Sequence, residues 1–298
     1  MAPPAPARLR GPRGAAALAA LLALAACGAA GQSYAVSRPS VVLFGDSITE
    51  FGFAGPSGWA SSLAQLYSRK ADVVNRGLAG WNTRWAAAVL PRVLADLAPA
   101  REAASKAGAA PWSPRVQLLV IWFGANDAVL PGGKDGALSV PLDEFRKNLA
   151  AMVAAARAAG VPHVLLVTPP PVDEAAWAKT NNRNASDRTN AQVAAYAAAV
   201  RAVSAGAGVP VLDVHAAVSA LPAAQRAAWT YDGVHPSAEG QAMVFGLLKA
   251  ALEGTPALAA VRPGSLPLHL PAYNQINATA PRATFDELFD RGLVTRGT

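Results

Sequence analysis

The chain has 298 residues, of which 52% are hydrophobic, and its 26 Lys and Arg against 19 Asp and Glu give a formal net charge of +7. That length allows one sizeable α/β domain or two small ones. The basic residues form no blocks, and Arg8, Arg10 and Arg13 lie near the amino terminus, so the charge gives no sign of nucleic-acid or membrane-surface binding.

Residues 1–35 have the composition of an export signal. The three arginines precede an apolar run at about 14–26, and small residues follow at Ala29 and Ala30. This order is typical of a cleaved secretory signal, and the apolar run is too short to span a bilayer. We therefore expect a secreted or exported protein. We expect no stable membrane insertion of its mature chain. A disordered leader or an organelle transit peptide is the alternative.

Cys27 is the only cysteine of the chain, so no intramolecular disulfide can form. The stretch Leu24-Ala25-Ala26-Cys27 resembles a bacterial lipoprotein cleavage box, which makes a lipid anchor on Cys27 an alternative to secretion. Asn184 and Asn277 begin acceptor patterns for N-glycosylation, which apply only if the source is eukaryotic.

From residue 40 onward, short apolar runs alternate with helical stripes. The runs predict five strands, at 40–45, 72–75, 116–123, 163–167 and 209–214. Helices are predicted at 58–69, 83–97, 141–159, 188–205 and 237–252. We expect a surface connection at 100–114, a polar loop at 172–187, and a loop with one short helix after the fifth strand.

This alternation predicts an α/β fold, a single doubly wound domain with a five-stranded parallel sheet flanked by helices. The leading topology is the flavodoxin-like order 2-1-3-4-5 with right-handed crossovers. We expect that domain to span residues 36–253. Residues 254–298 are predicted to be a proline-rich extension that packs on it, with a short helix near 284–289.

The first strand ends at Gly45-Asp46-Ser47, which presents a serine just beyond a buried strand. Sites in open α/β sheets form outside the carboxyl ends of the strands, so Ser47 is a candidate nucleophile. Serine is also a common first residue before a helix, and Ser47 as a helix cap is the alternative.

Other suitable residues follow the other strands. Gly80 comes after the second strand and Asn126 after the third, while Asp232 and His235 precede the last helix. An aspartate three residues before a histidine can orient the imidazole, which would then serve as the base for a serine. Gly80 can offer a backbone N–H and Asn126 a side-chain amide to an oxyanion. Each also has an ordinary role, since Asp-Gly and Gly80 suit turns and Asn126 can cap a loop.

Several other kinds of site are not indicated. The Gly-x-Ser-x-Gly elbow of α/β-hydrolases is absent around Ser47. No two histidines have metal-ligand spacing, and no glycine loop ends in Lys-Ser/Thr, so we expect neither a metal nor a nucleotide. His163, His215 and His269 lie in or beside apolar stretches, which favours structural roles.

The blocks around Ser47, Gly80, Asn126 and His235 together resemble those of the SGNH (GDSL-type) hydrolases. Within that family, Asn75-Arg76-Gly77, Val140-Pro141-Leu142 and Thr168-Pro169-Pro170-Pro171 resemble the isoamyl acetate-hydrolysing esterase subgroup. The similarity runs from about residue 40 to 252. The leader departs from the pattern of this subgroup, because such esterases usually begin close to the block that contains the serine.

The resemblance implies a serine esterase, without cofactor, that cleaves small acetate-type esters through an acyl-enzyme. Ser47 would attack, His235 would act as base and Asp232 would orient His235, with an oxyanion hole formed by Ser47, Gly80 and Asn126. Candidates for the pocket wall are Phe51, Phe53, Trp81, Trp122 and Phe123, with a place in the core as the alternative, since aromatic residues beside strands are more often core. The alternatives are a carbohydrate O-deacetylase on the same machinery and a non-catalytic binding protein that keeps the fold.

Overall fold

The computed structural model describes residues 34–35, 38–97, 116–290 and 294–295. Its main sheet has five strands, all parallel, in the order β3-β2-β4-β5-β6. They are β2 (Ser40–Gly45), β3 (Asp72–Gly77), β4 (Val116–Trp122), β5 (His163–Val167) and β6 (Val211–Leu212). Counted along the chain, this is the predicted order 2-1-3-4-5, and the doubly wound α/β fold is confirmed.

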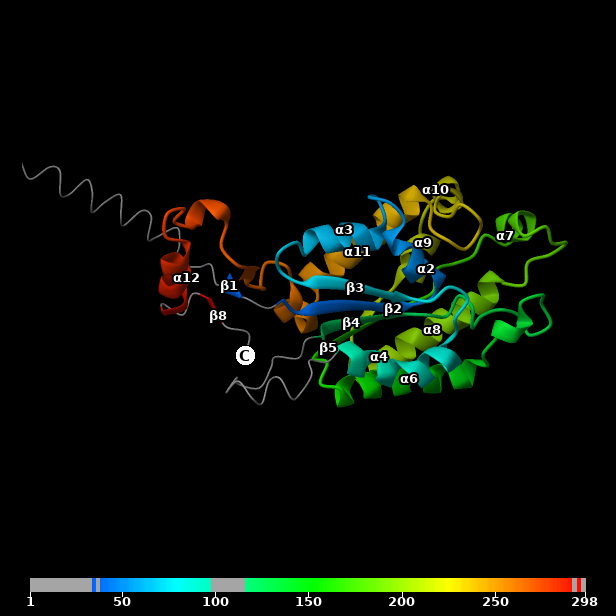
Figure 1. The fold of residues 1–298 in the computed structure, drawn as a ribbon. Helices are drawn as coiled ribbons and strands as arrows, with labels where there is room; N and C mark the ends of the chain where they lie inside the picture. Colours follow the sequence, from blue (N-terminus) through cyan, green and yellow to red (C-terminus); the bar gives the residue numbers. More distant parts are fainter. Residues whose placement is uncertain (1–33, 36–37, 98–115, 291–293, 296–298) are drawn as a thin grey trace, which may run out of the picture.

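Helices cover both faces of this sheet (Figure 1). One face carries α3 (Trp59–Leu66) and α11 (Ala238–Gly254), and the other carries α4 (Thr83–Leu97), α6 (Leu142–Ala158) and α8 (Asn190–Ala207). Alternate residues of β2 enter two separate cores, Val42 and Phe44 on the α4 side and Val41 and Leu43 on the α3 side. Strands β2, β4 and β5 are buried on both faces and are therefore nearly continuous apolar runs, which is why the sequence predicts these three well.

The ends of the long helices have local causes. Thr189 caps α8 by accepting a hydrogen bond on its hydroxyl from the Gln192 N–H, and Gly208 ends that helix with a φ of 63°. Ser237 caps α11 in the same way, through the Gly240 N–H. Caps of this kind satisfy backbone donors that have no partner inside the helix.

The predicted loop at 172–187 is partly wrong, because it contains helix α7 (Glu174–Thr180). Asp173 caps this helix through the Ala176 N–H, and Glu174 lies in its first turn. Only Trp177 of the helix is buried. A seven-residue helix with one buried side chain has no apolar period, so the cap is the only signal in the sequence.

The fifth strand is shorter than predicted and the following loop is more helical. Asp213 already caps helix α9 (Val214–Ser219) through the Ala216 N–H, which leaves β6 only two residues. A second short helix, α10 (Ala223–Ala228), follows.

Beyond α11, the chain forms several short elements, and its segment at 261–270 contacts the residues that follow α3. The short elements are η3 (Pro256–Val261), β7 (Leu268–His269), η4 (Tyr273–Gln275) and α12 (Pro281–Asp290). The Tyr67 hydroxyl donates to the Val261 carbonyl at 2.6 Å, and Lys70 Nζ donates to the Pro263 carbonyl at 2.5 Å. β7 also pairs with β1 (Tyr34–Ala35), which pairs with β8 (Val294–Thr295) in a second, three-stranded sheet that the sequence did not predict. The division into a domain at 36–253 and an extension stays a prediction.

The apolar leader run, Cys27 and the connection at 100–114 lie outside the described residues. Within the described part of the chain, no helix combines the length and apolar character needed to cross a membrane.

Candidate active site

Three of the candidate residues lie just beyond the carboxyl ends of neighbouring strands of the main sheet. Neighbouring strands place five residues in register at its carboxyl end, namely Gly77, Gly45, Trp122, Val167 and Leu212. Ser47, Gly80 and Asn126 lie two to four positions beyond the first three of these residues. Parallel strands end on a common side, so the loops that carry them share one edge.

Ser47 is the first residue of the short helix α2 (Ser47–Glu50), which starts directly after β2. The cap of this helix is Asp46, whose Oδ1 accepts a hydrogen bond from the Ile48 N–H at 3.0 Å. A Cβ at Gly45 would lie 2.1 Å from Thr49 Oγ1 and 2.6 Å from the Trp122 carbonyl, so the turn into α2 requires glycine. The capping role considered for Ser47 therefore belongs to Asp46, and the Ser47 hydroxyl contacts His235 instead.

Ser47, His235 and Asp232 form a continuous chain of hydrogen bonds. His235 Nε2 lies 2.8 Å from Ser47 Oγ, and His235 Nδ1 lies 2.6 Å from Asp232 Oδ2. A carboxylate can only accept, so the Nδ1 proton lies on the Asp232 side and Nε2 is left to accept from the serine hydroxyl. This is the arrangement of a nucleophile, a base and a group that orients the base.

Asp232 is held as a carboxylate within its own loop. Burial acts to raise its pKa, but hydrogen bonds from the His235 ring and from the N–H groups of His235 and Val234 outweigh it, so the pKa lies below its usual value. The loop turns at Gly233, whose φ of 102° and closeness to the Asp173 carbonyl exclude a side chain. An ionised Asp232 can stabilise a protonated imidazole.

Aromatic rings surround the His235 imidazole. Tyr231 stacks on it with centroids 5.8 Å apart, Phe51 lies at 5.4 Å and Trp177 at 6.4 Å. Tyr231 is 63% exposed and Phe51 36%, so both present apolar surface beside the imidazole. Sequence reasoning missed Tyr231, although it adjoins Asp232.

Asn126 has both ends of its side-chain amide bound. Its Nδ2 donates to the Trp81 carbonyl at 2.9 Å, and its Oδ1 accepts from Arg188 Nη2 at 3.2 Å. One of its two amide hydrogens thus has a protein acceptor, which leaves the second for a ligand. The N–H groups of Ser47 and Gly80 donate to no acceptor among the residues that the structure describes. Gly80 adopts a φ of 78°, a conformation that favours glycine.

The other aromatic candidates for the pocket are placed differently. Trp81 is partly buried and its ring lies 6.2 Å from that of Trp85, which is 40% exposed. Phe123 is 1% exposed and packs edge-on against Phe44 in the core, and Trp122 is equally buried on the opposite face. Phe123 and Trp122 are therefore core residues, because strand β4 is covered on both sides.

Two buried carboxylates adjoin the site without taking part in the hydrogen-bond chain. Burial raises the pKa of Asp46 to about 7, against the opposing hydrogen bond from Ile48. Burial likewise raises the pKa of Asp127 to about 6, although Thr83 donates to it from both its N–H and its hydroxyl. Both groups therefore release their protons closer to neutral pH than ordinary aspartates do.

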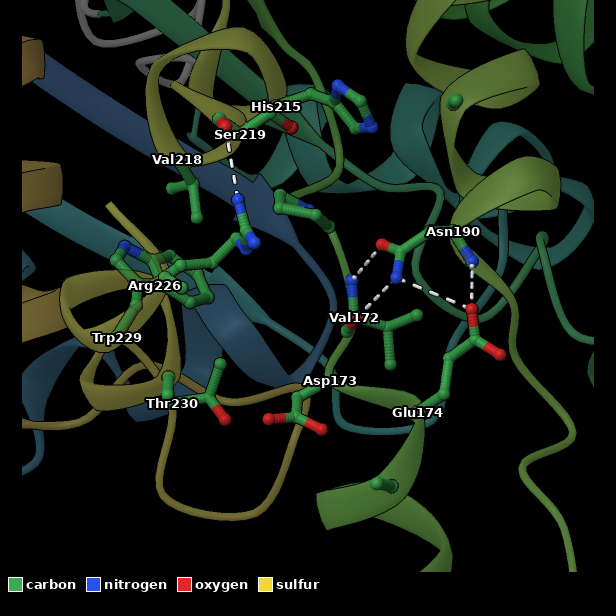
Figure 2. Close-up of a pocket in the computed structure, with 15 residues that line it drawn as sticks. Val172, Asp173, Glu174, Asn190, His215, Val218, Ser219, Arg226, Trp229 and Thr230 are labelled. Atoms are coloured by element: carbon green, nitrogen blue, oxygen red, sulfur yellow. Dashed lines mark hydrogen bonds between the residues drawn. The ribbon is translucent and has the colours of Figure 1, made fainter. Parts of the chain in front are cut away.

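A separate cavity of about 610 Å³ lies between helices α7 to α10 (Figure 2). Trp229 and Thr230 form one wall and Asp173 and Glu174 another. Ser47, Gly80, Asn126 and His235 do not line it. Among the described residues, no three His, Cys, Asp or Glu side chains are grouped so that they could hold a metal ion.

A family model described as the GDSL-like Lipase/Acylhydrolase family matches residues 43–243. The chain belongs to this family. The matched range includes Ser47, Gly80, Asn126, Asp232 and His235. This GDSL-family protein is a carboxylic ester hydrolase, as its curated relatives also indicate.

Two of these relatives match more than four fifths of the chain. The isoamyl acetate-hydrolyzing esterase 1 homolog of Bos taurus is 36% identical over 247 residues, which are 82% of this chain and 90% of the relative. A GDSL esterase/lipase of Arabidopsis thaliana is 34% identical over 255 residues, 84% of this chain and 99% of the relative.

Solved structures support the fold alone, because their sequence identities are low. An acetyl xylan esterase superposes with a TM-score of 0.54 at 18% identity, over 72% of this chain and 99% of that one. A lipase/acylhydrolase from Enterococcus faecalis superposes with a TM-score of 0.50 at 24% identity, over 73% of this chain and 96% of that one.

Proposed function

We propose that this esterase hydrolyses small acetate-type esters through an acyl-enzyme on Ser47. The observation that carries the proposal is the unbroken chain from Ser47 Oγ through His235 to Asp232, with contacts of 2.8 and 2.6 Å. The similarity to isoamyl acetate-hydrolyzing esterase homologues supports a short acyl group and a small alcohol.

The first half-reaction forms the acyl-enzyme. Ser47 Oγ attacks the ester carbonyl carbon while its proton passes to His235 Nε2, and the carbonyl oxygen becomes an oxyanion. The N–H groups of Ser47 and Gly80 and the free amide hydrogen of Asn126 stabilise that charge. The bond between the carbonyl carbon and the alcohol oxygen then breaks, and His235 gives its proton to the departing alcohol.

The second half-reaction releases the acid. His235 takes a proton from a water molecule, whose oxygen attacks the acyl carbon, and the bond to Ser47 Oγ breaks as the proton returns to the serine. Asp232 holds the imidazole in one tautomer and stabilises its protonated form through both steps. Phe51 and Tyr231 supply apolar surface beside the base for the alcohol part of the ester.

A substrate panel tests this proposal. Hydrolysis of p-nitrophenyl esters from acetate to decanoate, of isoamyl acetate and of acetylated xylo-oligosaccharides is measured with wild type and Ser47→Ala. We expect kcat/KM to be highest for the acetates of small alcohols and to fall with acyl-chain length, and the variant to be inactive. Faster turnover of the acetylated sugars would favour the carbohydrate O-deacetylase. Binding without turnover of any ester would favour the non-catalytic protein.

The leader extends the proposal to the compartment. Its basic and apolar segments direct export and are then removed, so the mature chain begins between about Ala26 and Tyr34. Amino-terminal sequencing of protein recovered from outside the cytoplasm measures the start directly. A start at Cys27 with the mass of a lipid would instead indicate a lipoprotein, and an intact Met1 would contradict export.

A further inference from the structure

Arg188 is a buried cation that contacts the candidate oxyanion donor. Its side chain is 5% exposed, its Nη2 donates to Asn126 Oδ1 at 3.2 Å, and its guanidinium lies over the Trp177 ring at 4.3 Å from the centroid. Arg188 is not among the residues that sequence reasoning selected. No step of the proposed reaction uses it.

The partners of the Asn126 amide fix which way the amide points. A guanidinium has only donors, so the atom that faces Arg188 must be the amide oxygen. A carbonyl has only acceptors, so the atom that faces the Trp81 oxygen must be the amide nitrogen. Of these two partners, only Arg188 acts through a side chain, so it is the one that a substitution can remove.

Arg188 is itself held by two acidic residues. Asp187 Oδ1 lies 3.0 Å from Arg188 Nη1, and Asp135 Oδ2 lies 3.6 Å from the same atom. The Asp187 carbonyl accepts from the Leu130 N–H at 2.8 Å, which ties the Arg188 segment to the loop that follows Asn126. Burial lowers the pKa of Arg188, and the two carboxylates oppose that shift.

We infer that Arg188 is a positioning residue for the oxyanion hole, which locks the Asn126 amide with its nitrogen toward the substrate and polarises it. A positive donor on Oδ1 draws electrons from the amide, so the free hydrogen on Nδ2 becomes a stronger donor to the developing oxyanion. The inference rests on the proposed function of Ser47 and Asn126. It predicts that Arg188 acts on the transition state, and only through Asn126.

Arg183 provides the matched control. It pairs with the same two carboxylates as Arg188, at 2.5 Å to Asp187 and 2.8 Å to Asp135, and its guanidinium lies 5.6 Å from the Trp177 ring centroid. No contact joins Arg183 to Asn126 among the described residues. Removing either arginine therefore disturbs the same ion-pair cluster, but only Arg188→Met frees the Asn126 amide.

The experiment is a double-mutant cycle on p-nitrophenyl acetate hydrolysis, with Arg188→Met, Asn126→Ala and the double variant. We expect Arg188→Met to lower kcat about 10- to 100-fold, the loss of one charged hydrogen bond, with KM changed only a few-fold. In the Asn126→Ala background it should lower kcat less than about twofold. Arg183→Met should keep kcat within about threefold of wild type. Arg188→Lys, which keeps a cationic donor without the planar fork, should fall between wild type and Arg188→Met.

A second readout does not depend on turnover. Affinity for a boronic acid, whose adduct with the serine carries a negative oxygen, should fall in Arg188→Met by the same factor as kcat and stay unchanged in Arg183→Met. Equal losses in the two arginine variants, or the same factor with and without Asn126, would overturn the inference and leave a structural role. Full activity of Ser47→Ala or Asn126→Ala would instead overturn the proposed function. The lysine variant keeps the test decisive if Arg188→Met does not fold.

Discussion

The proposed base unit and the proposed oxyanion donor are held in place by different kinds of contact. The Asp232 carboxylate accepts hydrogen bonds from residues two and three positions further along its own loop. The whole Asp232–His235 unit therefore forms within four consecutive residues. Asn126 is held by Trp81 and Arg188, which are 45 and 62 positions distant. Asp232 and His235 are therefore held by short-range hydrogen bonds, whereas the Asn126 amide depends on distant segments that must pack correctly.

This difference determines how each part should respond to mutation. We expect a change in the Asp232–His235 unit to act directly on the proposed chemistry, because both carboxylate oxygens of Asp232 accept hydrogen bonds from His235 or Val234. A change on the donor side can act from a distance, through the segment at 183–188. The predictions below separate the two, from the largest expected effect to the smallest.

Asp232→Asn should lower kcat by about 10⁴-fold with little change in the fold. The asparagine keeps an oxygen for the Val234 and His235 N–H groups, but its amide can donate to Nδ1 and so stabilise the wrong imidazole tautomer. Steady-state kinetics and circular dichroism measure the two effects. A variant with more than a tenth of wild-type turnover would show that Asp232 does not orient the base.

Asn126→Ala should lower kcat by about 10²–10³-fold, while KM moves only a few-fold. Charge develops on the ester oxygen only as Ser47 attacks, so a donor aimed at that oxygen acts mainly on the transition state. If Asn126 is only a loop cap, its loss should cost about 1 kcal/mol of stability and leave kcat intact. Measuring kcat, KM and Tm on this variant decides between the two roles.

Asp46→Asn should leave the helix cap in place and change the pH dependence of stability. The pKa of Asp46 is about 7 in the folded protein against 3.8 ordinarily, so between these pH values the folded state binds more protons than the unfolded state. The free energy of unfolding therefore falls as pH rises from about 4 to about 7. Asp46→Asn has no carboxyl group at this position, so this contribution to the fall is absent from the variant. We expect the Tm of Asp46→Asn minus the Tm of wild type to increase as pH rises across this range.

Thermal unfolding from pH 4 to 8 checks this prediction. Asp143→Asn, which removes a carboxylate whose side chain is 85% exposed, is the control. Curves for Asp46→Asn and wild type that stay parallel across the range would show that burial of Asp46 does not shift its titration.

The sequence predicted the parts of the molecule that rest on local patterns. A strand buried on both faces is a continuous apolar run, so β5 was placed at its observed bounds. Helix α4 was also placed at its observed bounds, because its buried residues recur at helical spacing. Helix α7 was missed because Trp177 alone is buried in it. The second sheet joins pairs of residues from both ends of the chain, and two residues carry no periodicity.

In the candidate site too, the sequence identified the residues that stand in local motifs and missed Arg188, which depends on a distant contact. Ser47 and the pair Asp232 and His235 stand in short motifs beside turns, so residue type and spacing identify them. Arg188 lies in a polar segment with no such pattern, and only the three-dimensional contact with Asn126 reveals it. Phe123 was a pocket candidate because it ends the strand predicted at 116–123, but whether a side chain at that point faces the core or the surface depends on what covers it.

The central claim is that Ser47 carries the acyl group. The most direct test is mass spectrometry of wild-type enzyme mixed with p-nitrophenyl acetate and quenched in acid within milliseconds. We predict one acetyl group on the peptide that contains Ser47, and none on that peptide in Ser47→Ala. An acetyl group on another residue, or turnover during which no acetylated Ser47 peptide forms, would contradict the account.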